Sequence, residues 1–393
     1  MTAGGRVTIV GHDASRSGAP LQLETSLRWA STHLDAELSL VLLRGGPLVE
    51  RYRSRIPVRV LDDPARRLLD RLACGVDGID RAGRAAGTVR VLMMGPGRRI
   101  DEGTIVANTL AALPAAAALA AGARLVAHVH ELDHVADRVL PAGPTRRRLL
   151  DRVDLFIAAG HPVARMLDRR WGIDRDRIAV VEPFIDPVDP VVGSTAQRAA
   201  GEAPLVVSVG ATSHRKGTDR FVDLMAMVCA GPSAPEGAWI GGDPGGTVGA
   251  EMRHDLSRGG LEARVGLVGE RDDVVSMVSA ADVVVSTARE DPFPLGVLEA
   301  AALDRPVVAF DSGGAAEVLR ASGNGDWVVP VGDTIAMHDR VATVLAGPDE
   351  AARRGRALGD HVRSRHLTAQ VAPDLWALLM GGAVDGPRFT GAS

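Results

Sequence analysis

The stretch HRKGTDRF, residues 214–221, contains the only lysine of the chain; every other member of its 45 Lys and Arg residues is Arg. Lysine places a compact charge on a flexible stem and often binds phosphate, whereas the arginine guanidinium is a planar fork. Arg215 and Lys216 precede Gly217 and a helix expected to start near Thr218. Cations are unfavourable at a helix N-terminus unless an anion binds there, so the pair predicts a diphosphate site. The alternative is one exposed lysine spared by codon drift.

A second group of chemically capable residues lies in TAREDPFPLGVLEAAAL, residues 287–303. Glu290 and Asp291 precede a Pro-Phe-Pro turn and an expected helix, where acidic residues serve as ordinary caps. Glu299 differs, because it lies inside this otherwise apolar helix. A buried carboxylate is costly unless something hydrogen-bonds to it, and a ligand that carries hydroxyl groups would do so. The spacing places one acid in the loop and the other two helical turns further on.

Three histidines lie in HVHELDH, residues 128–134, at the end of an expected strand. His130 follows the strand, with Glu131 beside it. His128, His130 and His134 could together bind a metal ion, but no further acidic or thiol ligand has suitable spacing. We therefore expect no metal and interpret His130 as a hydrogen-bond partner of a ligand hydroxyl. A satisfied core position is the alternative for His128.

Glycine-containing turns follow other expected strands. GHDASRSGAP, residues 11–20, contains Ser17 and Gly18 before a helix that begins near Pro20. GGDPGGTVG, residues 241–249, follows a strand in the second half. Backbone amides at a helix N-terminus favour an anion, and glycine permits the close approach of a ligand. A plain strand-to-helix turn is the alternative for each segment.

Short apolar runs alternate with helix-length segments from end to end. Runs without a period of two indicate strands that are buried on both faces, as in parallel sheets. In the first half, strands are expected at Val7–Val10, Leu38–Leu43, Val89–Met94, Leu125–Val129, Leu155–Ala158 and Ile178–Val180, and helices at Leu21–His33 and His161–Arg170. In the second half, strands are expected at Leu205–Val209, Ala238–Ile240, Val265–Val268, Val283–Ser286, Val307–Phe310 and Trp327–Val329. The alternation predicts an α/β fold with two doubly wound, Rossmann-like domains.

The alternation stops at residues 186–204, where Pro, Gly, Ser, Thr and Ala indicate a linker. We therefore expect an N-terminal domain at 1–185 and a C-terminal domain at 205–365, facing each other across a cleft. Residues 366–393 are expected to form a helix that crosses back to the first domain, followed by a tail. Ligands of such sheets bind beyond the carboxyl ends of the strands, where the turns described above lie.

The composition narrows the class of protein. With 46% hydrophobic and 24% charged residues, the 393-residue chain is globular rather than disordered, and its length favours two domains. Cys74 and Cys229 form no disulfide framework, which favours a reducing cytoplasm. The N-terminus lacks the pattern of a signal peptide, and no apolar stretch is long enough to span a bilayer.

The charge of the chain is divided unevenly, with a net +6 in residues 1–185 and a net −10 in residues 186–393. The basic half could attract an anionic partner or contact a membrane surface peripherally, and a solvated, arginine-rich surface is the alternative. Nucleic acid is not an expected partner, because the basic residues are not interleaved with stacking aromatic side chains.

Together these motifs resemble the family-4-like retaining glycosyltransferases, which have the two-domain GT-B fold. The family's hallmark is Glu, seven residues and Glu, typically within E-G-F-G-L-x-x-L-E-A. Here REDPFPLGVLEA, residues 289–300, has Asp as the first acid and is similar to a subgroup form of the motif. The resemblance implies ribose contacts for Glu299. It implies donor-sugar contacts for the loop residues Asp291, Phe293, Pro294 and Leu295, and Glu290 is expected to bind the donor beside them.

The resemblance also covers the cationic segment. The family clamps the donor diphosphate with an Arg in V-G-R and a Lys in K-G. Lys216 and Gly217 match the second motif, whereas Ala211 stands at the position of the family's Arg. Arg215 is expected to supply the missing charge.

In the first half, SRSGAP, residues 15–20, resembles the family's glycine loop under the diphosphate, which implies donor contacts for Ser17 and Gly18. HVHEL resembles the segment with the family's histidine at the reaction centre, which corresponds to His130. The resemblance extends over nearly the whole chain and is closest in the C-terminal half.

The function that the resemblance implies is transfer of a sugar from a nucleoside-diphosphate sugar with retention of configuration, without a metal or cofactor. His130, Lys216 and Asp291 are the expected catalytic residues. The acceptor would be a saccharide, a lipid-linked glycan or a small natural product, in the cytoplasm, with or without peripheral contact at the inner face of the membrane. A nucleotide-sugar 2-epimerase of the same fold and a non-catalytic partner subunit are the alternatives.

Overall fold

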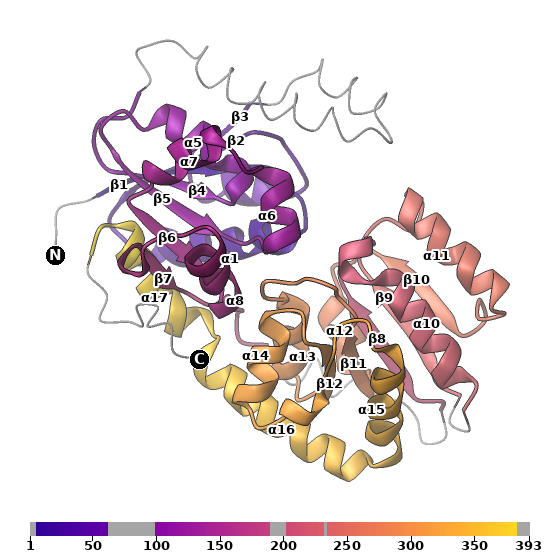
Figure 1. Cartoon of the computed structure of the whole chain (residues 1–393). Coiled ribbons are helices and arrows are strands. Elements are labelled where there is room, and N and C mark those ends of the chain that lie inside the picture. The colour runs from indigo at the N-terminus through magenta and orange to yellow at the C-terminus, as the bar shows by residue number, and fades with distance from the viewer. Residues whose placement is uncertain (1–4, 62–98, 189–201, 232–233, 383–393) are drawn as a thin grey trace. The chain divides into compact units, whose positions relative to one another are not determined.

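The computed structural model describes residues 5–61, 99–188, 202–231 and 234–382 of the chain (Figure 1). The chain divides into two compact units. One consists of Met1–Pro183 with Thr368–Ser393, and the other consists of Phe184–Leu367. The chain therefore crosses between the units twice, once beside the boundary expected at 185 and again near the one expected at 366. Most of the expected linker, residues 189–201, lies outside the described residues.

In the first unit, the described strands form one parallel sheet in the order β3-β2-β1-β4-β5-β6-β7. Its strands are β1 (Arg6–Gly11), β2 (Glu37–Leu42), β3 (Val58–Val60), β4 (Thr104–Asn108), β5 (Arg124–Val129), β6 (Leu155–Ala158) and β7 (Ile178–Val180). The expected strands that correspond to β1, β2, β5, β6 and β7 are confirmed. β3 and β4 were not predicted, and Val89–Met94 lies outside the described residues.

Helices cover both faces of this sheet. α1 (Gly18–His33) and α17 (Thr368–Leu379) pack on one face, and the opposite face carries an apolar core with α5, α7 and α8. The expected helix at 161–170 is divided into α8 and a π-helical turn, η3. The remaining bounds are α2 (Val49–Arg53), η2 (Leu110–Ala112), α5 (Leu113–Leu119), α6 (Asp133–Val139), α7 (Pro144–Asp151), α8 (His161–Arg165), η3 (Met166–Arg170) and η4 (Arg175–Arg177).

The second unit repeats this plan with a parallel sheet whose described strands run in the order β10-β9-β8-β11-β12-β13. They are β8 (Leu205–Val209), β9 (Glu236–Ile240), β10 (Val265–Gly269), β11 (Val283–Ser286), β12 (Val307–Phe310) and β13 (Val328–Val329). All six expected strands are confirmed, except that Trp327 belongs to a short helical turn before β13.

Two apolar cores cover the faces of this second sheet, one with α10, α11 and α15 and the other with α12, α13, α14 and α16. The helices are η5 (His214–Lys216), α10 (Thr218–Cys229), α11 (Thr247–Arg258), α12 (Val274–Ser279), α13 (Leu295–Ala302), α14 (Gly314–Ala321), η6 (Gly325–Trp327), α15 (Thr334–Ala346) and α16 (Pro348–Arg365). The fold class is thus α/β with two doubly wound sheets, as the sequence predicts.

Strand order reverses direction between β1 and β4 in the first sheet and between β8 and β11 in the second. Ligands of open α/β sheets bind at such switch points, beyond the carboxyl ends of the strands. The loops after β1, β4 and β5 therefore form the candidate region of the first unit. The loops after β8 and β11 form that of the second.

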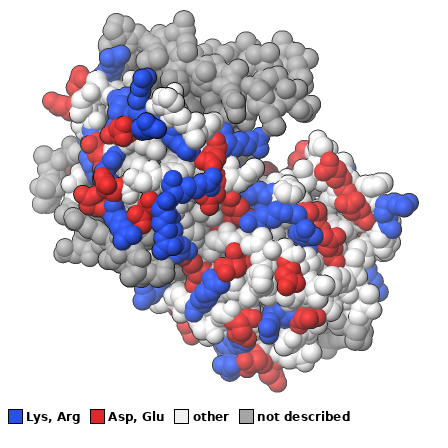
Figure 2. Space-filling view, viewed as in Figure 1, with Lys and Arg blue, Asp and Glu red and all other residues white. Residues whose placement is uncertain are grey.

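Positive and negative side chains are interspersed on the face drawn in Figure 2. In the first unit, Arg146 pairs with Asp137, Arg170 pairs with Asp133 and Asp137, and other arginines pair similarly. The excess of arginine in this half is therefore partly neutralised by neighbouring carboxylates. No helix among the described residues is both long and apolar enough to cross a membrane.

Candidate active site

The cationic loop of the second unit is built around a short helical turn, η5, that follows β8. The hydroxyl of Ser213 accepts a hydrogen bond from the backbone N–H of Lys216 at 3.3 Å and caps this turn. Gly217 ends the turn in the left-handed region, with φ of 70°. Thr287, just after β11, donates its hydroxyl to the carbonyl of Gly217 at 2.9 Å. The loop after β8 is thus anchored on the strand at the other side of the switch point.

Lys216 forms an ion pair with Asp291 across the switch point, and both side chains are largely buried. Arg215 lies beside them, with Nη1 3.8 Å from Oδ1 of Asp291 and 2.8 Å from the carbonyl oxygen of Glu290. The structure therefore brings together four of the predicted site residues: Arg215, Lys216, Glu290 and Asp291. Arg215 and Lys216 thus flank the Asp291 carboxylate, and by formal charge the two cations and the two acidic residues of this group balance each other.

The loop with Phe293 is fixed from several sides. The N–H of Asp291 donates to the carbonyl of Ser312 at 3.0 Å, and the N–H of Gly314 donates to the carbonyl of Pro292 at 3.0 Å. Phe293 is buried, and its ring lies 5.4 Å from that of His366. A Cβ at Gly314 would lie 2.4 Å from the Phe293 ring, so a glycine is required there. These contacts set the backbone of the loop before any ligand arrives.

Glu299 lies on α13, which begins at Leu295 after the N-cap residue Pro294. Its apolar neighbours on the helix are buried, and Glu299 itself is half-buried. Burial raises the pKa of its carboxyl. Among the described residues, the side chain of Glu299 has no hydrogen-bond or ion-pair partner. A ligand with hydroxyl groups would satisfy this carboxylate, as the sequence suggested.

Ser17 and Gly18 lie on the first unit, at the N-terminus of α1. Both are exposed, and a Cβ at Gly18 would meet nothing within 4 Å. The Ser17 hydroxyl lies 2.9 Å from that of Ser15, which in turn donates to Asp13. The turn is therefore open, and the contacts proposed for Ser17 and Gly18 stay predictions.

His130 also lies on the first unit, directly after β5. Its ring is 4.0 Å from that of His128, measured between centroids. Burial, followed by the nearby His128 and His12, holds the pKa of His130 well below its usual range. Nε2 of His130 is buried without a hydrogen-bond partner among the described residues. The ring is therefore neutral at physiological pH and has a nitrogen available for a ligand.

The three histidines of the metal alternative lie in different surroundings. Within the described part of the chain, no group of three or more His, Cys, Asp and Glu side chains is arranged to hold a metal ion. His134 is exposed on α6, whereas His128 is buried on β5 with a pKa lowered to about 4 by burial. His128 is thus a buried core residue, which was the alternative interpretation of this histidine.

Three residues around His130 were not predicted as site residues: His12, Thr109 and Glu131. Thr109 follows β4, and its hydroxyl lies 3.2 Å from Nδ1 of His12, which follows β1. Glu131 is buried and accepts backbone hydrogen bonds from Leu110 and His130. The sequence held one signal for Thr109, namely the apolar run of β4 directly before it. A strand predicted there would have placed Thr109 at the switch point of the sheet.

The two doubly wound sheets in separate units, with charged loops at the switch point of the second, define the GT-B class. The sequence model described as glycosyl transferases group 1 matches residues 203–347, and that described as Glycosyltransferase Family 4 matches residues 104–189. The chain belongs to the family-4-like glycosyltransferases of the GT-B fold.

Curated relatives carry glycosyltransferase names. The chain is 31% identical over 210 residues to the lipopolysaccharide core biosynthesis mannosyltransferase LpsB of Rhizobium meliloti, an alignment that covers 50% of this chain and 57% of LpsB. It is 27% identical over 362 residues to the D-inositol 3-phosphate glycosyltransferase of Xylanimonas cellulosilytica, covering 81% of this chain and 86% of that protein. Alignments with the first three relatives span 57%, 58% and 50% of those proteins.

Solved structures share the fold over nearly the whole chain. HepE from Anabaena, in complex with UDP and glucose, has a TM-score of 0.76 at 22% identity and covers 95% of this chain and 99% of HepE. Sucrose-phosphate synthase from Thermosynechococcus elongatus has a TM-score of 0.73 at 20% identity and covers 95% and 98%. At these identities the likeness establishes the fold.

Proposed function

We propose that the protein is a retaining glycosyltransferase that moves a sugar from a nucleoside-diphosphate sugar to an acceptor hydroxyl without a metal ion. The observation that carries the proposal is the cluster of Arg215, Lys216 and Asp291 at the switch point of the second sheet. Its two adjacent cations, Arg215 and Lys216, fit a diphosphate. The family, and relatives named as mannosyl- and inositol-phosphate glycosyltransferases, support the same class of reaction.

In this proposal Lys216 and Arg215 bind the donor diphosphate, and Arg215 compensates for Ala211. Charge on the diphosphate increases as its bond to the sugar breaks, so fixed cations stabilise the transition state more than the ground state. When Lys216 turns to the phosphate, Asp291 is released from its ion pair. Its carboxylate then accepts hydrogen bonds from hydroxyls of the donor sugar.

The other predicted residues have supporting roles. The backbone of the fixed loop at Phe293, Pro294 and Leu295 borders the sugar, with Glu290 beside it. Glu299 accepts hydrogen bonds from the ribose hydroxyls, which would satisfy its unpartnered carboxylate. On the first unit, Ser17 and Gly18 contribute open backbone and hydroxyl groups to the donor, and His130 contacts the reacting centre.

The acceptor belongs to the class of saccharides, lipid-linked glycans or small hydroxyl-bearing natural products. The names of two relatives point the same way, since LpsB is a mannosyltransferase of lipopolysaccharide core biosynthesis and the other is a D-inositol 3-phosphate glycosyltransferase. On the face drawn in Figure 2 the charges are interspersed, and this face would suit a hydroxyl-rich acceptor better than a broad anionic surface. Any contact with a membrane would thus be peripheral and local.

The test is a donor screen followed by a Lys216 variant. Thermal shift with UDP-glucose, GDP-mannose and related nucleotide sugars identifies a donor, because a ligand that binds the native state raises the melting temperature. Release of nucleoside diphosphate, with and without saccharide acceptors, then separates transfer from epimerisation and from mere binding. Lys216→Ala should lower kcat at least about 100-fold.

Because Asp291 is buried against Lys216, the alanine variant also costs stability. Its kinetics must therefore be measured well below its unfolding temperature, beside Arg258→Ala, which removes an exposed cation from the end of α11. Arg258→Ala should keep the wild-type rate. Wild-type turnover in a folded Lys216→Ala protein would disprove the diphosphate role.

A further inference from the structure

The turn after β4 in the first unit is strained. Thr109 has a φ of 104°, which is rare for a β-branched residue, and its side chain is buried. Its N–H donates to the carbonyl of His128 on β5 at 2.9 Å. Strained residues of this kind cost about 1–3 kcal/mol and persist only where the surroundings fix them, which is common at functional sites.

Glu131 gives this turn a second link to the end of β5, beside the hydrogen bond from Thr109 to His128. Its Oε1 accepts from the N–H of Leu110 at 2.9 Å, and its Oε2 accepts from the N–H of His130 at 3.0 Å. The two amides belong to different strand ends, one after β4 and the other after β5. The carboxylate therefore sets the distance between the strained turn and the backbone of His130.

The ring of His130 depends on this backbone for its orientation. Its buried Nε2 has no partner among the described residues, and the ring lies against that of the core residue His128. The adjacent His12 is held in turn by the Thr109 hydroxyl and by Asp13, whose Oδ1 lies 3.4 Å from Nε2 of His12. A shift of the Glu131 carboxylate would thus move both histidines relative to each other.

We propose that Glu131 is a positioning residue: its buried carboxylate, by accepting the N–H groups of Leu110 and His130, orients the His130 imidazole toward the sugar-transfer centre. The inference rests on the proposed function in that His130 contacts the reacting groups. A cap for the helical turn η2 would need only one of the two carboxylate oxygens. The use of the second oxygen on the amide of His130 indicates the positioning role.

The electrostatics of the site agree with this geometry. Burial raises the pKa of Glu131 to about 7, while the backbone N–H groups of His130, Leu110, Ala111 and Glu131 itself act in the opposite direction and favour the carboxylate. Both amides can only donate. Gln at this position would place an NH₂ group against one of them, at nearly unchanged volume, and would break one of the two bonds.

The experiment compares Glu131→Gln with the wild type in the release of nucleoside diphosphate from UDP-glucose and GDP-mannose. We expect kcat to fall at least ten-fold, with KM for the nucleotide sugar within two-fold. The double variant Glu131→Gln with His130→Ala should be no slower than His130→Ala alone, because both changes remove one function. Additive losses, or an unchanged kcat, would overturn the proposal.

Glu24→Gln is the matched control. Glu24 is also buried on the first unit, but its carboxylate pairs with Arg51 at 3.0 Å. This variant should keep the wild-type kcat. If Glu131→Gln does not fold, Glu131→Asp replaces it, since the shorter side chain keeps the charge but cannot span both amides. If neither variant folds while Glu24→Gln does, the role of Glu131 is structural and the positioning proposal is wrong.

A readout that needs no turnover separates this inference from the proposed function. The imidazole resonances of His130 in ¹⁵N NMR spectra, assigned by their loss in His130→Ala, should shift in Glu131→Gln and stay in place in Glu24→Gln. If the wild type turns over no nucleotide sugar yet these resonances shift, the proposed function fails and the positioning stands. Unshifted resonances would overturn the positioning itself.

Discussion

The turn that holds Lys216 depends on the single residue Gly217. Its φ of 70° suits glycine, and a Cβ there would lie 1.9 Å from the carbonyl oxygen of Thr287. Since Thr287 also anchors the turn by its hydroxyl, any retreat of the loop would break that hydrogen bond. The position of Lys216 beside Asp291 therefore follows from the absence of a side chain one residue further on.

We predict that Gly217→Ala destabilises the protein by about 3 kcal/mol, through the left-handed backbone and the steric overlap. Urea unfolding followed by circular dichroism measures the change. Gly18→Ala is the matched control, because a Cβ there meets nothing within 4 Å, and it should change stability by less than about 0.5 kcal/mol. Equal stabilities of the two variants would contradict this account of the turn.

The sequence predicted which residues make the charged cluster but not how they pair. A point-charge lysine at a helix N-terminus indicated an anion, and the structure instead places its ammonium on Asp291. Lys216 and Asp291 are 75 residues apart, so their contact depends on the pairing of β8 with β11, which no local pattern contains. Thr109 and Glu131 escaped prediction for the same reason: their roles arise only where neighbouring strands end.

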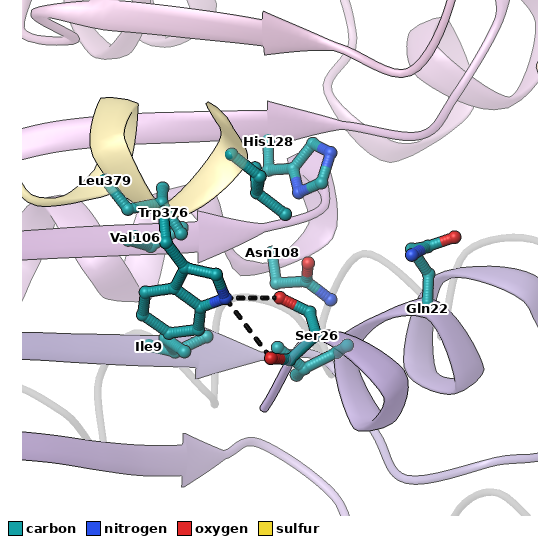
Figure 3. Close-up of a pocket in the computed structure, with 10 residues that line it drawn as sticks. Ile9, Gln22, Ser26, Val106, Asn108, His128, Trp376 and Leu379 are labelled. Carbon is teal, nitrogen blue, oxygen red and sulfur yellow. Dashed lines mark hydrogen bonds between the residues drawn. The ribbon is translucent and has the colours of Figure 1, made fainter. Parts of the chain in front are cut away.

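At the scale of elements, α17 completes the first unit. Trp376 is 1% exposed, and its Nε1 donates to the hydroxyl and the carbonyl of Ser26 on α1, at 2.9 and 3.2 Å (Figure 3). Asn108 and His128 lie beside this contact and line the same cavity (Figure 3). Its volume is about 10 Å³, which is close to the least that one water molecule needs. Together with α1, the helix thus covers one face of the sheet that contains β5, the strand directly before His130.

Removal of this aromatic side chain should be costly. Trp376→Ala is expected to destabilise the protein by about 3–5 kcal/mol, from lost burial and the cavity that remains. Thermal and denaturant unfolding give the value. Asp374→Ala changes an exposed residue of the same helix and should lie within about 0.5 kcal/mol of the wild type. A small effect of Trp376→Ala would show that α17 is dispensable to the first unit.

The pattern of elements was largely predictable, because parallel strands buried on both faces form uninterrupted apolar runs. β11 and β12 were predicted with their observed bounds for this reason. β4 was missed although it is fully buried, since its run Thr104–Asn108 includes polar residues at both ends. The division of residues 161–170 into α8 and η3 was also missed, because α- and π-helical turns share similar apolar spacing.

For the whole molecule, buried titratable groups give stability a dependence on pH. Burial lowers the pKa of His12, His128 and His130, so these residues gain protons on unfolding below about pH 6.5. Their contribution to stability therefore rises with pH over the window from about 4 to 6.5. Glu131, with a pKa raised to about 7, has the opposite effect, because the native state holds its proton more tightly.

We predict that the histidines dominate on the acid side, so that the melting temperature falls as the pH decreases from 6.5 to about 4.5. His128→Gln should reduce this dependence on pH, because His128 has a pKa near 4 in the folded protein. Its contribution to the free energy of unfolding changes by up to about 3 kcal/mol over the window from about pH 4 to 6.5. Calorimetry at several pH values tests the slope rather than the absolute stability. An unchanged slope in His128→Gln would contradict the assignment.

The first unit is assembled from both ends of the described chain, since Thr368–Leu379 packs with α1 while residues 184–367 form a unit of their own. On the ribosome, the second unit has therefore been synthesised completely before the helix that closes the first one emerges. During that interval the face of the β1–β7 sheet that α1 and α17 share is covered by α1 alone. Nascent chains arrested before residue 368 should thus contain a protease-resistant second unit and a first unit that is still open to attack.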